Sequence, residues 1–144
     1  MEEMDQQLDA YTVVLVESEK SLRRVLSVSL TELGLRVLEA PDLDCARDLL
    51  NTECPDLLIT EIDFPFGRNG ELIEQFRNQK GDCRGSVVVT TTQRYGDAWR
   101  HRYHPDVTLY KPFDIRLLCK SVSRLLSQDQ DDDMRYRTEK GIRK

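Results

Sequence analysis

A long hydrophobic stretch is missing from this sequence: no apolar run approaches the roughly 18 residues that a membrane-spanning helix needs. The first residues, MEEMDQQLDAY, are acidic and polar, the opposite of a secretory signal peptide, so we expect a cytoplasmic protein without membrane contact. A surplus of basic residues is missing as well, because 21 Lys and Arg face 26 Asp and Glu and give a formal net charge of −5. Since non-specific nucleic-acid binding depends on basic neutralisation of phosphates, we expect no direct nucleic-acid partner.

Cysteine is scarce. The four cysteines, Cys45, Cys54, Cys83 and Cys119, include no C-x-x-C pair, so we expect reduced thiols rather than a zinc site or a disulfide framework. P-loop, G-x-S-x-G and H-E-x-x-H motifs are also absent, which removes the common signatures of nucleotide-binding loops, serine hydrolases and zinc proteases.

The sequence does contain a regular alternation of short apolar segments with helical patterns. The apolar segments are residues 12–16, 35–39, 57–60, 87–90 and 107–110. Runs such as TVVLV and VVVT are rich in β-branched residues, which is typical of strands buried on both faces. Helices are predicted between them, although residues 94–104 form a poor helix by propensity. Five alternations predict an α/β sandwich in which helices cover both faces of a parallel five-stranded sheet.

Helix-terminating and capping residues mark the ends of the predicted helices. Gly34 stands where a helix needs a left-handed residue after its last turn. Pro41-Asp42 opens the second predicted helix, and Asn69 and Asp114 are candidate caps at the starts of later helices.

A chain of 144 residues is long enough for one domain and too short for two comfortable ones. We place the domain at residues 11–127, after a polar lead-in of residues 1–10. Residues 128–144 combine an acidic cluster with basic residues, which predicts a charged, disordered tail.

Polar residues follow four of the predicted strands. Glu17-Ser18-Glu19 follows the first strand, Glu61 ends the third, Thr90 ends the fourth, and Lys111 follows the fifth. The carboxyl ends of parallel strands are where such sheets assemble their working residues. Carboxylates hold divalent cations, and a hydroxyl with an ammonium neutralises phosphoryl oxygens, so this set suits phosphoryl chemistry.

At these positions the sequence resembles the response-regulator receiver family, of which CheY-like proteins are members. The resemblance covers residues 11–127 and is carried by VVLVESEKSLRRVL, PDLLITEIDFP, VVVTTT and LYKPFD. It implies a flavodoxin-like (βα)5 fold with strand order 2-1-3-4-5. It also implies a phosphorylation-controlled switch in two-component, or phosphorelay, signal transduction.

The resemblance assigns family roles to individual residues. Glu61 falls where the family has its phosphoacceptor aspartate, and Glu17 and Ser18 fall at the paired acids that organise magnesium. Thr90 matches the hydroxyl of the phosphate pocket and Lys111 matches its lysine.

Two of these positions, Glu61 and Ser18, and a third position, Thr108, depart from the family pattern. Glu61 carries its carboxylate about 1.5 Å, one bond length, further out than aspartate would, and misplacement by about 1 Å can cost roughly 100-fold in rate. Ser18 contributes no charge to the metal site. Thr108 stands where many members have a switching Tyr or Phe, and it cannot act as an aromatic rotamer switch.

These departures predict a pseudo-receiver: a protein–protein interaction module that works without phosphorylation and has weak or absent Mg²⁺ binding. Glu17 and Glu61 are the only weak metal candidates. The alternative is a receiver that is still phosphorylated, on Asp63 or on Glu61 itself.

We expect no enzymatic activity. A flavin site needs a small phosphate-wrapping loop after the first strand, and ESEKS is acidic instead. A phosphohydrolase of the haloacid dehalogenase type needs Asp followed two residues later by Asp, and Glu61-Ile62-Asp63 has the spacing with the wrong first residue.

The expected partners are signalling proteins, either a histidine kinase or a downstream effector. The resemblance implies docking on the face formed by the fourth helix, the fifth strand and the fifth helix, which would also serve a homodimer. Trp99, Tyr103 and Tyr110 are the candidate anchors there, because aromatic side chains dominate interface energetics. The alternative for Trp99 is a place in the core.

Overall fold

The computed structural model describes residues 11–62, 68–80, 85–92 and 98–139, and it leaves out the side chains of residues 68, 98, 99 and 128–139. The elements are β1 (Thr12–Val16), α2 (Lys20–Glu32), β2 (Arg36–Ala40), α3 (Leu43–Glu53), β3 (Leu57–Glu61), α4 (Arg68–Lys80), β4 (Ser86–Thr91), α5 (Ala98–Tyr103), β5 (Val107–Tyr110) and α6 (Ile115–Glu139). All four strand pairs are parallel and the sheet order is β2-β1-β3-β4-β5, which confirms the predicted fold class.

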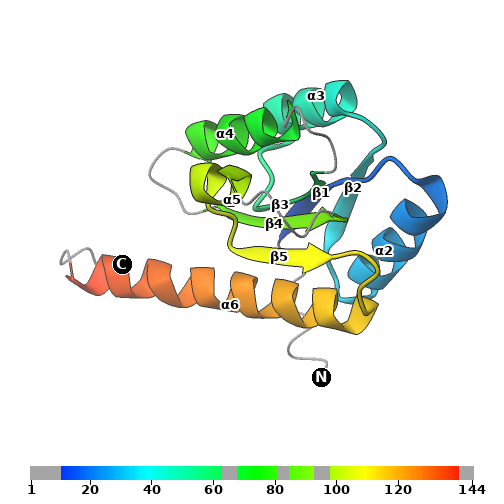
Figure 1. Cartoon of the computed structure of the whole chain (residues 1–144). Coiled ribbons are helices and arrows are strands. Elements are labelled where there is room, and N and C mark those ends of the chain that lie inside the picture. The colour runs from blue at the N-terminus through cyan, green and yellow to red at the C-terminus, as the bar shows by residue number, and fades with distance from the viewer. Residues whose placement is uncertain (1–10, 63–67, 81–84, 93–97, 140–144) are drawn as a thin grey trace.

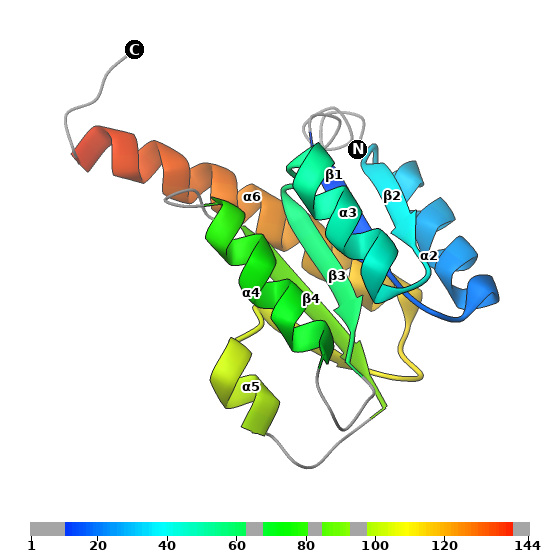
Figure 2. The same ribbon diagram turned by 90° about the horizontal axis from the view of Figure 1, so that it is seen from above.

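Helices cover both faces of this sheet (Figures 1 and 2). One face packs on α2 and α6 through a core that includes Val13, Leu15 and Val88. The opposite face packs on α3, α4 and α5 through a second core that includes Val14 and Val89. Alternate residues of each strand therefore enter different cores, and central strands buried on both faces become continuous apolar runs.

Most predicted helix ends agree with the structure. Gly34 has a φ of 97° just after α2, and the Asp42 side chain accepts a hydrogen bond from the Cys45 N–H at the start of α3. Asn69 is the exception, because it lies inside the first turn of α4. Its side-chain amide donates instead to the main-chain oxygen of Glu61 at 2.7 Å.

The amino ends of β3 and β5 begin with the same three-part turn. Cys54 and His104 each follow a helix in a left-handed conformation, with φ of 46° and 49°. Each is followed by Pro-Asp, and the aspartate accepts a main-chain N–H from a neighbouring strand. Asp56 Oδ2 accepts from Thr12 at 2.9 Å, and Asp106 Oδ2 accepts from Val87 at 2.8 Å.

The last turns of α4 hold both of these turns. Lys80 Nζ donates to the Pro55 carbonyl at 3.1 Å, and Arg77 donates to the carbonyls of Tyr103 and His104, the latter at 2.7 Å. One helix therefore ties together the starts of β3 and β5.

The prediction of a disordered tail from residue 128 is wrong for residues 128–139, because α6 continues to Glu139. No glycine or proline interrupts residues 115–139, so nothing in the backbone stops the helix. In Figure 1 this part of α6 runs on past the sheet. Within the described residues, no helix is long and apolar enough to span a bilayer.

Candidate functional site

Strand alternation brings four of the predicted site residues to one side of the sheet. Glu61 follows the parity of Leu57 and Ile59 in β3, whose side chains lie in the core beneath α2 and α6. Glu17 continues the same parity from β1, Thr90 continues it in β4, and Lys111 continues it from β5. The parallel register sets Glu61 directly beside Thr90. The sequence thus delivers all four to the carboxyl edge and to the same face.

Two carboxylates and one ammonium form the centre of the site. Lys111 Nζ lies 3.0 Å from Glu17 Oε1 and 3.4 Å from Glu61 Oε1. Glu17 is 1% exposed and Glu61 5% exposed. Glu17 Oε1 is buried and, despite the ammonium at ion-pair distance, makes no well-oriented hydrogen bond among the described residues. The cluster would carry one excess negative charge if all three groups were ionised.

The loop after β1 closes over these carboxylates with main-chain donors. The Ser18 N–H donates to Glu61 Oε2 at 3.1 Å, and the Glu19 N–H donates to Glu17 Oε2 at 3.0 Å. Arg23, on the second turn of α2, fixes this loop by donating to the Glu17 carbonyl at 2.8 Å and pairing with Glu39 at 3.3 Å. Ser18 therefore contributes its main-chain N–H to the site, although the residue is exposed to solvent.

Among the described residues, the Glu61 carboxylate accepts from Ser18 and Lys111 and not from the Thr90 hydroxyl. Thr90 is buried at 2% exposure beside Glu61, and its main-chain oxygen accepts from the Ile62 N–H at 2.9 Å. The neighbouring Thr91 hydroxyl donates to the Ile62 carbonyl at 2.5 Å. These bonds fix the backbone after β3, so the direction in which Glu61 leaves the strand is well determined.

Burial raises the pKa of the Glu61 carboxyl, and the charge of Glu17 raises it further. Hydrogen bonding from Ser18 and the charge of Lys111 act in the opposite direction without overcoming the burial effect. The Lys111 ammonium lies between two carboxylates, so it offsets only part of the effect of burial on Glu61.

No group of three His, Cys, Asp or Glu side chains among the described residues is arranged to hold a metal ion. Glu17 and Glu61 turn one oxygen each toward the same point, and that point is occupied by Lys111 Nζ. Asp63, the substitute acceptor, lies outside the described residues.

Thr108 lies on the opposite face from the carboxylate cluster. It lines a surface hollow beside β5 together with Arg100, His104 and Tyr110. Tyr110 is half-buried, and its hydroxyl accepts from Arg100 Nη1 at 3.4 Å. Thr108 and Tyr110 thus belong to the predicted docking face rather than to the pocket.

Tyr103 is not an exposed anchor, and that prediction is wrong. Its side chain is 8% exposed and belongs to the core beneath α3 and α4. A β-carbon placed on Gly70 would overlap the Tyr103 ring, so the absence of a side chain at Gly70 makes room for it. The side chain of Trp99 lies outside the described ones.

Sequence reasoning missed Arg23 and mistook the role of Asn69. Both bind main-chain carbonyls across the fold, Glu17 in one case and Glu61 in the other. No spacing of residues in the sequence predicts such a contact, because the contact depends on how a helix packs beside the end of a strand.

No family model matches the sequence. A curated relative, the "Regulator of RpoS" of Escherichia coli, is 32% identical over 94 residues, which are 65% of this chain and 28% of that protein. The chain thus spans little more than a quarter of the curated relative it matches there.

Solved structures show the same fold at lower identity. A CheY-like response regulator receiver domain protein from Methanospirillum hungatei has a TM-score of 0.75 at 15% identity, covering 85% of this chain and 98% of that one. The response regulator TrrA from Thermotoga maritima, solved in complex with Mg²⁺-BeF, has a TM-score of 0.67 at 22% identity and covers 80% and 98% of the two chains. The fold is therefore that of CheY-like receiver domains.

Proposed function

We propose that this chain is a receiver domain of a two-component signalling protein and that it works as a non-enzymatic interaction module without phosphorylation at Glu61. The order of its strands, the positions of Glu17, Glu61 and Lys111, and the likeness to receiver domains support this function. The relative that is 32% identical is by its name a regulator, which agrees with a role in signalling.

The observation that carries the proposal is the occupation of both Glu61 oxygens. Oε2 accepts from the Ser18 N–H and Oε1 faces Lys111 Nζ. A main-chain donor and an ammonium are the groups that would stabilise phosphoryl oxygens during transfer. In this chain they already bind the longer side chain, so Glu61 partly substitutes for a phosphorylated acceptor. The mimicry is partial because a carboxylate carries one charge and a phosphoryl group nearly two.

Weak or absent magnesium binding is part of the same proposal. Mg²⁺ requires near-octahedral oxygen coordination, usually with one or two carboxylates and several waters. Glu17 and Glu61 would have to release Lys111 to serve as ligands, and Ser18 supplies no charge. The residues present fit an ion-pair network better than a divalent cation, and we derive no step through a metal.

The proposed partners are a histidine kinase or a downstream effector, or a second copy of the chain, bound on the face formed by α5, β5 and α6. Because Tyr103 is buried, we place the centre of this face at Tyr110 and the hollow lined by Arg100 and Thr108. β5 is also the last strand in the order of the sheet, and edge strands suit association.

Intact-protein mass spectrometry after incubation with acetyl phosphate and Mg²⁺ tests the proposal. We expect no stoichiometric gain of a phosphoryl group, whereas a receiver domain with an acceptor aspartate gains one under the same conditions. A gain mapped to Asp63 or Glu61 would establish the alternative, a receiver that is still phosphorylated. The double variant Glu61→Asp with Ser18→Asp should acquire the modification, because it restores the acidic pattern around Lys111.

The docking face is tested separately by pull-down from the native source and by sedimentation. Tyr110→Ala should weaken association about ten-fold or more, since truncating an aromatic anchor commonly costs ~2 kcal/mol. Val28→Ala, at an exposed position on α2, is the matched control and should leave association unchanged. Equal loss with both variants would show that the face was assigned wrongly.

A further inference from the structure

A groove runs between α2 and α6 on the side of the molecule away from α3, α4 and α5. Leu33, Ile115 and Cys119 give it an apolar floor, and Ser29 and Ser123 line its walls. At Ile115 it joins a second apolar hollow that leads up to Lys111. The groove therefore extends from the amino end of the sheet toward the carboxylate cluster.

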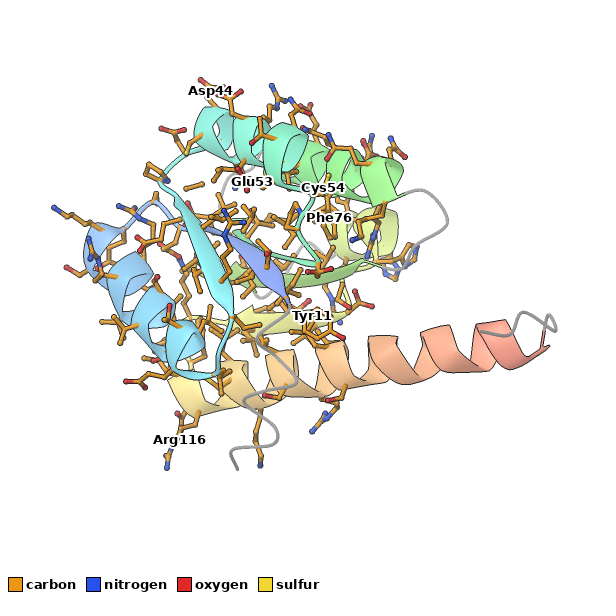
Figure 3. The ribbon with its side chains drawn as sticks, turned by 180° about the vertical axis from the view of Figure 1, so that it is seen from behind. Tyr11, Asp44, Glu53, Cys54, Phe76 and Arg116 are labelled. Atoms are coloured by element: carbon orange, nitrogen blue, oxygen red, sulfur yellow. The ribbon has the colours of Figure 1, made fainter. Side chains whose placement is uncertain are left out.

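Basic side chains form one wall of this groove. Arg116, Lys120 and Arg124 are spaced four residues apart on α6, so they share one side of the helix, and all three are exposed. Arg116 pairs with Asp114 at 2.9 Å and projects from the first turn of α6 (Figure 3). Lys120 and Arg124 have no ion pair among the described residues. Among the described residues, Glu32, at the end of α2, is the only acidic one that lines the groove.

Residues 1–10 have the complementary chemistry. The sequence MEEMDQQLDA contains four acidic residues and no Lys or Arg. Its larger apolar residues, Met1, Met4 and Leu8, have helical spacing and would share one face of a helix.

The chain enters the fold at the amino end of the sheet, where one end of the groove lies. The Tyr11 carbonyl accepts from the Arg36 N–H at 3.1 Å, just after the turn that ends α2. The Tyr11 side chain packs against the core beneath α2 and α6, and Figure 3 shows it beside α6. Ten residues in helical form span about 15 Å, close to the roughly 16 Å between residues 116 and 127 of α6.

We propose that residues 1–10 bind in the groove between α2 and α6 as an acidic amphipathic helix. Met4 and Leu8 lie on the apolar floor, and the acidic side chains face Lys120 and Arg124. The occupant is this chain's own segment because it joins the domain at the groove's end and so has a high effective concentration there. Its charge matches the basic wall, whereas a second copy would oppose one basic α6 to another.

Cys119 gives a direct reporter, because it lines the groove, while Cys54 is exposed at the far side of the sheet. The full chain is treated with iodoacetamide in pulses, and alkylation of each cysteine is mapped by peptide mass spectrometry. The variant Met4→Ser with Leu8→Ser removes the apolar contacts and keeps every charge. If the segment covers the groove in about two molecules of three, its release raises the Cys119 rate about three-fold.

The Cys54 rate should be the same in both proteins, and circular dichroism should show an unchanged fold. Added salt should raise the Cys119 rate in the parent chain and leave the variant unchanged, since screening weakens the exposed charge pairs. Equal Cys119 rates in the two proteins would overturn the proposal. So would a Cys119 rate that falls with protein concentration in both, because a second copy would then be the occupant.

Discussion

Carboxylates stand at both ends of the parallel sheet, and the two ends use them differently. At the amino end Asp56 and Asp106 each accept a main-chain N–H from a neighbouring strand, and each has a basic residue of α4 within 4.0 Å. At the carboxyl end Glu17 and Glu61 share the single ammonium of Lys111.

The aspartates therefore have a structural role, and the glutamates are the acids to which the proposed function assigns a role. Each aspartate links one turn to one strand and has its own hydrogen-bond donors. The amino end of the sheet is therefore held by separate local interactions. The glutamates are almost fully buried and undercompensated, an arrangement that often contributes little to stability compared with apolar packing. Such clusters at the carboxyl ends of parallel strands are where function is expected.

The largest expected effect comes from removing the shared ammonium. Lys111→Met leaves two carboxylates buried without a cation, so unfolding in urea at neutral pH should show a loss of about 3 kcal/mol. The loss should shrink at acid pH as the carboxyls take up protons. Lys20→Met, at an exposed position at the start of α2, is the control and should change stability by less than about 0.5 kcal/mol. A small effect of Lys111→Met would mean that the cluster is hydrated and resembles the amino end.

At the amino end of the sheet, removing a single hydrogen bond should lower the stability of the domain. Asp106→Ala leaves the main-chain N–H of the fully buried Val87 without its acceptor, which should cost about 2 kcal/mol in urea unfolding. Asp106→Asn retains an acceptor oxygen and should recover most of this loss. Hydrogen exchange of the Val87 amide provides a local measurement. Unchanged protection in Asp106→Ala would show that the hydrogen bond to Asp106 is dispensable.

Glu61→Gln should stabilise the domain at neutral pH by about 1 kcal/mol, because it removes one of two buried charges and retains the shape of the side chain. The pKa of Glu61 is raised in the folded state, mainly by burial. Its contribution to stability is therefore complete below the pKa of a free glutamate and is lost as pH rises through the raised value.

The parent chain should accordingly lose stability as pH increases across that window, and Glu61→Gln should lack this part of the pH profile. Thermal unfolding from acid to neutral pH measures both. Glu74→Gln, at an exposed position on α4, should retain the parent profile. Parallel profiles for Glu61→Gln and the parent would show that the site does not hold Glu61 at a raised pKa.

The sequence predicted the features that depend on local residue patterns and on the alternation of side chains along each strand. Each of the five strands agrees with its predicted segment to within one residue at either end. Glu17, Glu61 and Lys111 could be brought together from the sequence because parallel strands align their carboxyl ends and side chains alternate in two faces.

Features that depend on helix packing could not be predicted in this way. Tyr103 is aromatic and flanked by arginine, as an interface anchor would be, yet it is buried because Gly70 on another helix makes room for it. Arg23 and Asn69 reach carbonyl groups on other elements. The charge pattern after residue 127 suggested disorder, and the helix continues there because charged residues do not interrupt a helical backbone.

The smallest expected effect concerns the left-handed residues that precede the two Pro-Asp turns of the amino end. Cys54 has a φ of 46°, a conformation that glycine adopts without strain and a residue with a β-carbon adopts at a cost. Cys54→Gly should therefore stabilise the domain by about 0.5 kcal/mol, the relief of strain being partly offset by the greater freedom of glycine in the unfolded chain. Cys54→Ala keeps the β-carbon and should give no gain, which separates backbone relief from loss of the thiol. His104→Gly should behave alike, because its φ of 49° and the following Pro-Asp repeat the same turn. Thermal unfolding of the three variants at one pH measures the differences, and a gain at only one glycine would show that the two turns are not energetically equivalent.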